Sequence, residues 1–186
     1  GSLLNIDIGG GSTELSLMHA GGIPEQLFSM KIGAVGLTKK FLFSNPPRES
    51  ELENLRREVS DALDTPRREL QTGNWQFVSG TSGTILNLSS LLNFRTSNDD
   101  CGEKCEIQFN RLVDLNKMLA KIPTEERARL PRVSPQRAEV LVAGGLILEA
   151  LMRALGIQKI KPCSYALREG MIIDHLHQNT VARARG

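Results

Sequence analysis

The residues best suited to chemistry gather in one octapeptide near the start of the chain, Asp7-Ile8-Gly9-Gly10-Gly11-Ser12-Thr13-Glu14. Three consecutive glycines let the backbone approach a ligand closely and turn successive N–H groups toward it. The hydroxyl groups of Ser12 and Thr13 add donors, and this set suits phosphate oxygens because they only accept hydrogen bonds. Asp7 is a carboxylate of the kind that holds hydrated Mg²⁺ beside a phosphate, and Glu14 could orient or deprotonate a water. The alternative is a glycine-rich hairpin with a capping aspartate.

A second small-residue segment, Gly80-Thr81-Ser82-Gly83-Thr84, lies between a predicted strand and a predicted helix. A helix N-terminus offers free N–H groups and about half a positive charge, so this segment predicts a second anion site. The alternative is a turn that caps the helix and uses small residues for tight packing. The two segments reinforce each other only if the fold brings them to the same edge.

Composition limits the classes of protein and of partner. The 186 residues are 40% hydrophobic and 24% charged, as in an ordinary globular domain, which excludes a disordered, collagen-like or coiled-coil chain. The net charge of +2 predicts neither a nucleic-acid nor a membrane partner. The longest apolar run, Val140 to Leu148, is far shorter than the roughly 20 residues of a membrane span and predicts a buried helix.

Cysteine usage predicts a cytoplasmic protein. The three cysteines are an odd number and no signal peptide opens the sequence, so we expect reduced thiols. Cys101 and Cys105 could suggest a metal, but zinc needs about four ligands and only three histidines are available elsewhere. We therefore interpret that segment as part of a polar loop.

Apolar periodicity and turn residues predict an α/β domain. Strands are predicted at Leu3–Ile8, Ser12–Met18, Gln26–Ile32, Trp75–Val78 and Lys159–Cys163. Helices are predicted at Gly33–Phe43, from Arg48 to a kink or end at Pro66, and then at Ile85–Leu92, Leu112–Leu119, Thr124–Leu130, Pro135–Leu155 and Ala166–His177. The first three strands form an antiparallel meander, and the later two alternate with helices. This order predicts one domain over residues 1–186, with a five-stranded mixed sheet and helices on both faces.

At these residues the sequence resembles the exopolyphosphatase and guanosine pentaphosphate phosphohydrolase (Ppx/GppA) family, a branch of the actin-like superfamily. The resemblance spans nearly the whole chain in order. It rests on the octapeptide at Asp7, Ile32-Gly33-Ala34-Val35-Gly36-Leu37-Thr38, the segment at Gly80, Ser134-Pro135-Gln136-Arg137-Ala138-Glu139 with Ala143-Gly144, Ala154-Leu155-Gly156-Ile157 and Leu167-Arg168-Glu169-Gly170. It implies a ribonuclease H-like lobe and Mg²⁺-dependent hydrolysis of a phosphoanhydride.

The resemblance also implies roles for particular residues. Asp7 helps to hold Mg²⁺, and Glu14 matches the functionally important glutamate of the motif. The phosphoryl group is bound by Gly9, Gly10, Gly11, Ser12 and Thr13, with a further phosphate or nucleotide contact at Gly80, Thr81, Ser82, Gly83 and Thr84. Arg137 and Arg168 are candidate anion contacts or structural ion-pair partners.

Two departures from the family pattern affect what we expect. Relatives carry an upstream actin-like lobe with a first phosphate loop and the glutamate thought to be the catalytic base, and residues 1–186 have neither. We therefore expect them to be the second lobe alone, inactive by itself, with the upstream lobe as partner and a homodimer as one way to cover a bare surface. Near Ser164, many relatives have an acidic residue that this sequence lacks.

The substrate stays open between inorganic polyphosphate and guanosine pentaphosphate, which end in similar phosphoanhydrides. Two other classes of function are carried beside hydrolysis. One is an ATPase lobe of the sugar or acetate kinase type, which would transfer phosphate to a hydroxyl or carboxylate. The other is a non-catalytic module that binds a phosphorylated metabolite.

Overall fold

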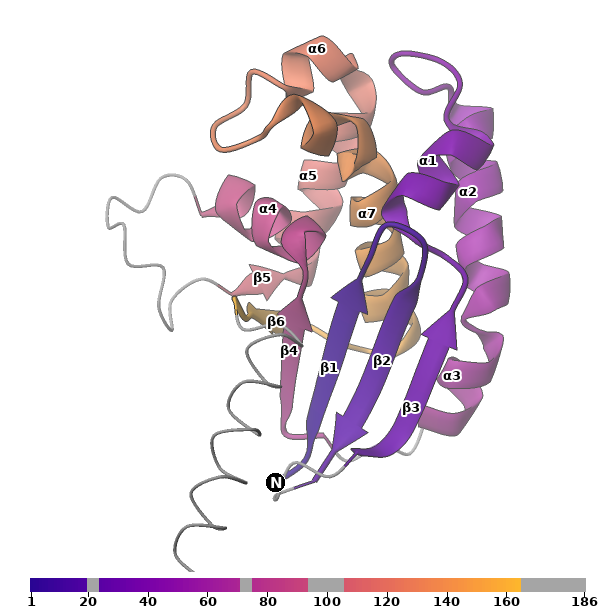
Figure 1. Ribbon diagram of the computed structural model, residues 1–186, viewed down its shortest axis with the longest axis vertical. Coiled ribbons are helices and arrows are strands. Elements are labelled where there is room, and N and C mark those ends of the chain that lie inside the picture. Colours follow the sequence, from indigo (N-terminus) through magenta and orange to yellow (C-terminus); the bar gives the residue numbers. More distant parts are fainter. Residues whose placement is uncertain (20–23, 71–74, 94–105, 165–186) are drawn as a thin grey trace, which may run out of the picture.

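The computed structural model describes residues 1–19, 24–70, 75–93 and 106–164 (Figure 1). A meander of β1 (Leu3–Ile8), β2 (Thr13–Met18) and β3 (Pro24–Met30) comes first. It is followed by α1 (Ala34–Phe41), α2 (Glu49–Ala62), α3 (Asp64–Glu69), β4 (Phe77–Thr81) and α4 (Gly83–Leu92). The remaining elements are β5 (Ile107–Gln108), α5 (Phe109–Lys121), α6 (Thr124–Arg127), α7 (Pro135–Ala154) and β6 (Lys159–Pro162).

The strands form one mixed sheet in the order β3-β2-β1-β4-β6-β5. The meander is antiparallel, whereas β4 pairs parallel to β1 and β6 parallel to β4. The predicted α/β architecture with a mixed sheet is confirmed, but the predicted number of five strands is wrong. The sixth strand, β5, has only two residues, paired antiparallel to β6, and is too short to produce an alternating pattern in the sequence.

The two faces of the sheet differ because side chains alternate along each strand. The even-numbered residues of β1 lie opposite the odd-numbered residues of β2, and both sets are buried; they are Leu4, Ile6, Ile8, Thr13, Leu15 and Leu17. Helices α4 and α7 contact β1. The other face carries half-buried side chains, including Asn5, Asp7, Glu14 and Ser16.

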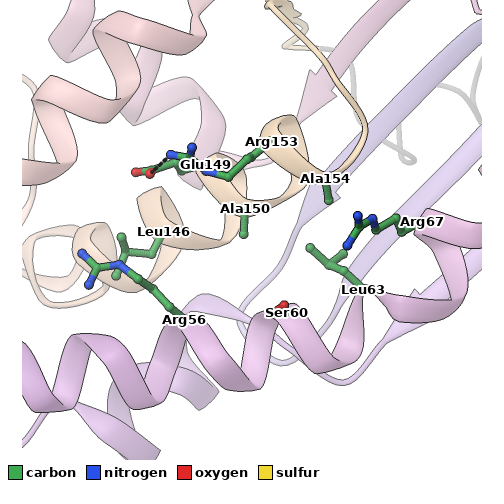
Figure 2. A pocket seen from close by; sticks show the side chains of 9 residues that line it. All are labelled: Arg56, Ser60, Leu63, Arg67, Leu146, Glu149, Ala150, Arg153 and Ala154. Carbon is green, nitrogen blue, oxygen red and sulfur yellow. Dashed lines mark hydrogen bonds and ion pairs between the residues drawn. The ribbon is translucent and has the colours of Figure 1, made fainter. Parts of the chain in front are cut away.

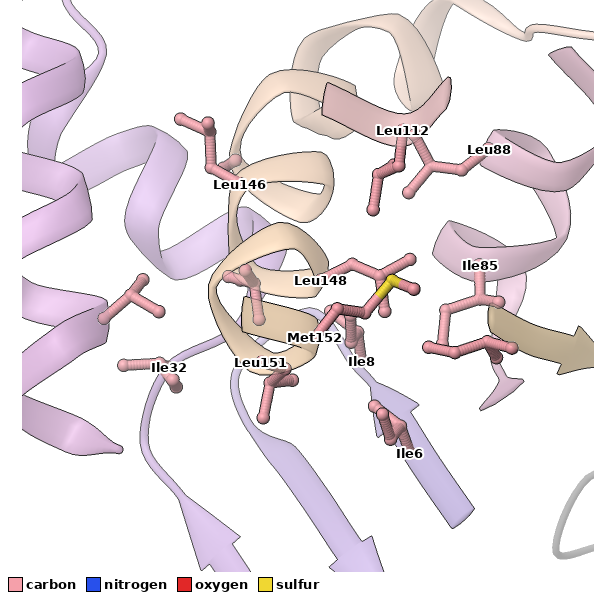
Figure 3. Packing of buried hydrophobic residues seen from close by; sticks show 14 of the residues in the cluster. Ile6, Ile8, Ile32, Ile85, Leu88, Leu112, Leu146, Leu148, Leu151 and Met152 are labelled. Carbon is pink, nitrogen blue, oxygen red and sulfur yellow. The ribbon is translucent and has the colours of Figure 1, made fainter. Parts of the chain in front are cut away.

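Helix α7 forms the centre of the core (Figure 3). Its residues from Val140 to Leu148 are all buried, and it contacts α1, α2, α4, α5 and α6 as well as β1. Figure 3 shows Leu151 and Met152 on the part of α7 that lies nearest the strand with Ile6 and Ile8. The apolar run in the sequence is therefore a buried helix, as predicted. In the described part of the chain, no helix is long and apolar enough to cross a membrane.

Proline and cap residues account for the helix boundaries. Ser134 caps α7 by accepting a hydrogen bond from the Arg137 amide, and the helix begins at Pro135, as predicted. Pro66 was expected to kink or end the second helix, but the break comes earlier. Helix α2 ends at Ala62, because Pro66 has no N–H to donate to the Ala62 carbonyl four residues before it. Pro66 itself lies in the first turn of α3. The predicted helix Ala166–His177 and the Cys101 and Cys105 thiols lie outside the described residues.

Candidate functional site

The loop between β1 and β2 is held by the start of α1. The Gly9 carbonyl accepts a hydrogen bond from the Ala34 amide at 3.0 Å. The Gly10 carbonyl accepts from the amides of Val35 at 2.9 Å and Gly36 at 3.0 Å. The first amides of a helix have no partner within the helix, so the loop carbonyls satisfy them.

This anchoring decides which way the loop amides point. In a trans peptide the C=O and the following N–H point in opposite directions, and within the described residues the cis peptide bond lies at Asn45-Pro46. Since the carbonyls of Gly9 and Gly10 face α1, the amides of Gly10 and Gly11 face away from it. Both glycines are exposed, and neither amide donates to a backbone carbonyl of the described residues. The Gly9 amide differs, because it donates to the Ser12 carbonyl at 2.9 Å.

Gly33, just before α1, makes this close approach possible. A Cβ atom at Gly33 would lie 2.5 Å from the carbonyl carbon and oxygen of Gly10 and from the carbonyl carbon of Gly11. Real Cβ atoms do not come so close to backbone, so a side chain here would push the loop away from α1. Gly33 therefore permits the contact with α1 that sets the direction of the loop amides.

Two carboxylates lie beside the loop on the half-buried face of the sheet. Asp7 on β1 is the direct cross-strand partner of Glu14 on β2, so both side chains project from the same face. The Ser29 hydroxyl donates to Glu14 Oε1 at 3.3 Å. Like charges directly opposite each other are unfavourable unless a cation lies near them.

This pair fits Mg²⁺ better than a metal that needs a complete protein cage. The described residues contain no group of three or more His, Cys, Asp or Glu side chains that could hold a metal. Mg²⁺ keeps several waters and is usually bound by one or two carboxylates together with substrate phosphates. The cross-strand carboxylates of Asp7 and Glu14 are a donor set of that kind.

Not every predicted donor reaches the site. Thr13 is fully buried, and its hydroxyl donates to the Ile32 carbonyl at 2.6 Å. The hydroxyl of Thr13 was expected to bind a phosphoryl group, but it faces the core because Thr13 is on the buried face of β2. It ties the hairpin to the segment before α1. Ser12, one residue earlier, is half-buried at the loop.

The second predicted segment lies at the same edge of the sheet as the first. Strands β1 and β4 are parallel neighbours, with Asp7 paired with Thr81, so both run out of the sheet on the same side (Figure 1). Asn5 links the strands, because its Nδ2 donates to Thr81 Oγ1 at 3.3 Å and its Oδ1 accepts from the Ser79 hydroxyl at 2.7 Å. The condition that the two segments must share an edge is met.

Within the second segment, most small residues serve packing. A Cβ at Gly80 would lie 2.9 Å from two methyl carbons of Ile85, and Thr84 is buried where a Cβ at Gly144 would overlap it. The Ser82 hydroxyl caps α4 by accepting from the Ile85 amide at 3.4 Å, and Ser82 has a φ of 103°. The alternative of a tight capping turn therefore describes Gly80 and Thr84 well.

The accessible part of the second segment is Ser82 and Gly83, with an arginine beside them. A Cβ at Gly83 would overlap the Arg137 guanidinium, so this cation lies against the first residue of α4. Arg137 is exposed, and no hydrogen bond or ion pair to its guanidinium is made by the described residues. Arg168, the other candidate anion contact, lies outside the described residues.

Comparison with known proteins shows which family the chain belongs to. The sequence profile of the Ppx/GppA phosphatase family matches residues 1–179. The chain belongs to the Ppx/GppA phosphatase family. Exopolyphosphatase 1 of Mycobacterium leprae is 36% identical over 183 residues, which are 95% of this chain and 52% of that protein. Exopolyphosphatase 1 of Mycobacterium tuberculosis is 36% identical over 180 residues, which are 95% and 51%.

Solved structures of Ppx/GppA proteins share the fold. The crystal structure of the Aquifex aeolicus family member superposes with a TM-score of 0.80 at 25% identity, over 96% of this chain and 57% of that one. An exopolyphosphatase from Cytophaga hutchinsonii superposes with a TM-score of 0.83 at 22% identity, over 95% and 57%. The predicted actin-like lobe is confirmed, and the chain spans about half the length of these relatives.

Two features of this Ppx/GppA lobe were not predicted from the sequence. Gly33 lies within a family motif, but its packing on the glycine loop was not predicted. The polar link from Asn5 to Ser79 and Thr81 was not predicted either. Alternation along β1 and β4 could have placed these three on one face, but their partnership depends on a register that only the fold supplies.

Proposed function

We propose that this chain is one lobe of a phosphoanhydride hydrolase. The reaction is release of the terminal phosphate of inorganic polyphosphate, or conversion of guanosine pentaphosphate to the tetraphosphate. The observation that carries the proposal is the pair of outward amides at Gly10 and Gly11 beside the carboxylates of Asp7 and Glu14. Family membership and the exopolyphosphatase relatives support it.

In this proposal the glycine loop binds the phosphoryl group that is cleaved. The amides of Gly10 and Gly11 and the hydroxyl of Ser12 donate to its oxygens. Donors fixed in advance stabilise charge that develops on those oxygens without having to reorganise during the reaction. The α1 anchor and Gly33 supply that rigidity, because they hold the loop carbonyls on the side away from the ligand.

The carboxylates of Asp7 and Glu14 would hold Mg²⁺ through water or directly. When bound, Mg²⁺ neutralises charge on the phosphate oxygens. Asp7 precedes the loop by two residues and Glu14 follows it by two, so the hairpin places both carboxylates at the base of the loop. Glu14 also accepts from the Ser29 hydroxyl, which helps to orient its carboxylate toward a water.

Ser82, Gly83 and Arg137 would contact a more distant phosphate of the substrate. Ser82 and Gly83 follow β4 and begin α4 at the same edge, and the Arg137 guanidinium of α7 lies against Gly83. A guanidinium and free helix amides both favour an anion. Gly80, Thr81 and Thr84 support this contact by holding the turn rather than by touching the ligand.

An upstream actin-like lobe would complete the site. Phosphoryl transfer depends mainly on positioning and charge neutralisation, and two facing lobes would clamp the end of the substrate. We expect the catalytic base in that upstream lobe, and losing a base alone costs about 10² to 10⁴-fold in rate. Residues 1–186 alone should therefore release no phosphate above background.

Phosphate release with three substrates tests the proposal. Polyphosphate, guanosine pentaphosphate and ATP are each incubated with Mg²⁺ and either residues 1–186 or the same residues joined to an upstream lobe. We expect release by the two-lobe protein alone, from polyphosphate or guanosine pentaphosphate and not from ATP, and loss of that release in Glu14→Gln. Turnover of ATP with transfer to an acceptor would favour the kinase-type lobe instead. Tight phosphate binding that survives Glu14→Gln, with no turnover by the two-lobe protein, would favour the binding module.

A further inference from the structure

A second cleft lies between α2–α3 and the C-terminal half of α7, lined by residues that the glycine-loop site does not use (Figure 2). It encloses about 380 Å³. Figure 2 shows Arg56 and Arg67 at its two ends, with Ser60 and Ala150 between them. The volume is within the range of small-molecule sites, which is about 300 to 1,000 Å³.

Small residues on both helices keep the cleft open. On the α2 side, Arg56, Ser60, Leu63 and Arg67 follow one another at helical spacing. On the α7 side, Ala150 and Ala154 form the facing stripe. Helices that meet through larger side chains would close this gap, so the cleft follows from the short side chains at its centre.

The charges around the cleft do not balance. Arg153 and Glu149 form an ion pair at 2.9 Å, and Glu149 also accepts from Asn116 Nδ2 at 2.9 Å. Arg56 pairs at 2.8 Å with Glu49, whose side chain is 69% exposed and lies outside the cleft. Such an exposed pair is weak and opens readily. The carboxylate in the cleft is therefore already satisfied, and two further arginines, Arg56 and Arg67, line the same cleft.

Arg67 is the decisive residue. Among the described residues, no hydrogen bond or ion pair engages its guanidinium. Its neighbour Arg68 provides a comparison, because Arg68 Nε donates to the Asp64 carbonyl at 3.2 Å within the same short helix and does not line the cleft. One arginine thus supports the end of α3, whereas the other extends over an apolar floor that includes Leu63.

We propose that this cleft binds a small organic anion, with its charged group on Arg67 and its apolar body against Leu63, Ala150 and Ala154. A guanidinium presents a planar fork of donors that matches a phosphate ester or a carboxylate. Arg56, at the far end, would attract a second negative charge where the ligand carries one. The inference does not rest on the proposed hydrolysis, since it uses none of the glycine-loop residues.

Calorimetric titration with phenyl phosphate and with benzoate tests the cleft and separates the two kinds of anion. Phenol and inorganic phosphate supply the body and the charge alone. We expect at least one of the two anions to bind. The anion that binds more tightly shows whether the cleft prefers a phosphate ester or a carboxylate. Phenol should not bind in the cleft. Arg67→Gln should weaken binding about tenfold, as expected for loss of a charge-assisted hydrogen bond.

Two further variants make the result decisive. Arg68→Gln removes the same charge one residue away and should leave binding within about twofold of the parent chain. Ser60→Leu fills the cleft from an exposed helix position without changing charge and should abolish the binding that depends on Arg67 while the chain stays folded by circular dichroism. Binding at the glycine loop would be unaffected by Arg67→Gln and is distinguished in this way. The proposal is overturned if no anion binding is weakened by Arg67→Gln, if Arg67→Gln and Arg68→Gln have the same effect, or if the Arg67-dependent binding survives Ser60→Leu.

Discussion

The two small-residue loops at the edge of the sheet look alike in sequence but are built differently. At residues 9–12 the glycine carbonyls bond to α1, so the amides of Gly10 and Gly11 face outward. At residues 80–84 the glycines make room for protein atoms, with Ile85 against Gly80 and the Arg137 guanidinium against Gly83. Glycine permits close approach in both loops, but at residues 80–84 the atoms that approach the glycines are side chains of the protein itself.

The difference between the loops comes from their neighbours. The first loop is anchored by a helix that begins more than twenty residues later, and the anchor needs Gly33. The second loop leads directly into α4, and Ser82 of the loop caps that helix. A glycine-rich motif therefore indicates a close backbone approach, and the surrounding fold decides whether protein or ligand makes that approach.

The largest effect is expected from Gly33→Ala. The new Cβ would overlap the backbone of Gly10 and Gly11, which cannot give way as a side chain can, so we expect about 3 kcal/mol of destabilisation. Urea denaturation of the purified chain measures it. Gly11→Ala is the control, because its Cβ meets no atom within 4 Å, and it should change stability by less than about 1 kcal/mol. Equal losses in the two variants would contradict the anchoring of the loop by α1.

A smaller effect is expected from Gly80→Ala in the second loop. Its Cβ would lie 2.9 Å from side-chain methyl groups of Ile85 and 3.1 Å from Ile160, and these can shift, so the cost should be about 1 to 2 kcal/mol. Ile85→Val in the same chain should restore part of the loss, measured by a double-mutant cycle in urea. Additive losses would show that packing against Ile85 is not the reason for glycine at this position.

The smallest effect concerns α2. The amide at its N-terminus donates to the side chain of Glu51 within the helix and not to a distant loop. Burial would raise the pKa of Glu51, but hydrogen bonds from the Arg48 amide and from the Ser44 hydroxyl and amide outweigh it, so the pKa is lowered. A lowered pKa in the folded state stabilises the protein above the ordinary carboxyl pKa of 4.5. That contribution is lost as pH falls below 4.5.

Glu51→Gln should therefore flatten the fall in stability below about pH 4.5 and leave the slope near pH 7 unchanged. Melting temperatures measured from pH 3 to 7 test this. An unchanged acid slope in the variant would show that Glu51 is not held by the start of α2. The test also separates a local cap from the long-range anchor that orients the glycine loop.

Much of the fold could be predicted because its signals are local. Apolar periodicity predicted the strand at Ser12–Met18, and the apolar run from Val140 to Leu148 predicted a buried helix. The two-residue strand β5 is too short to leave a periodic signal in the sequence. The end of α2 was placed too late, because the proline affects the helix four residues earlier, at the carbonyl that would have accepted its missing N–H.

The candidate site was predictable as a set of residues but not as a geometry. The octapeptide predicted a phosphate loop, and the parallel pairing of β1 with β4 brings both loops to one edge. The Thr13 hydroxyl was expected to bind phosphate, but Thr13 is buried and its hydroxyl donates to the Ile32 carbonyl. The role of Gly33 depends on a contact across more than twenty residues, which spacing along the chain does not show.

The outward direction of the loop amides is tested most directly by backbone amide chemical shifts. Tripolyphosphate is titrated with Mg²⁺ into ¹⁵N-labelled protein, and the glycine resonances are followed. We predict saturable shifts at Gly10 and Gly11, and much smaller shifts at Gly9, whose amide already donates to Ser12, and at Gly80, which is buried. Unmoved resonances at Gly10 and Gly11, with binding observed elsewhere on the chain, would contradict the phosphate loop.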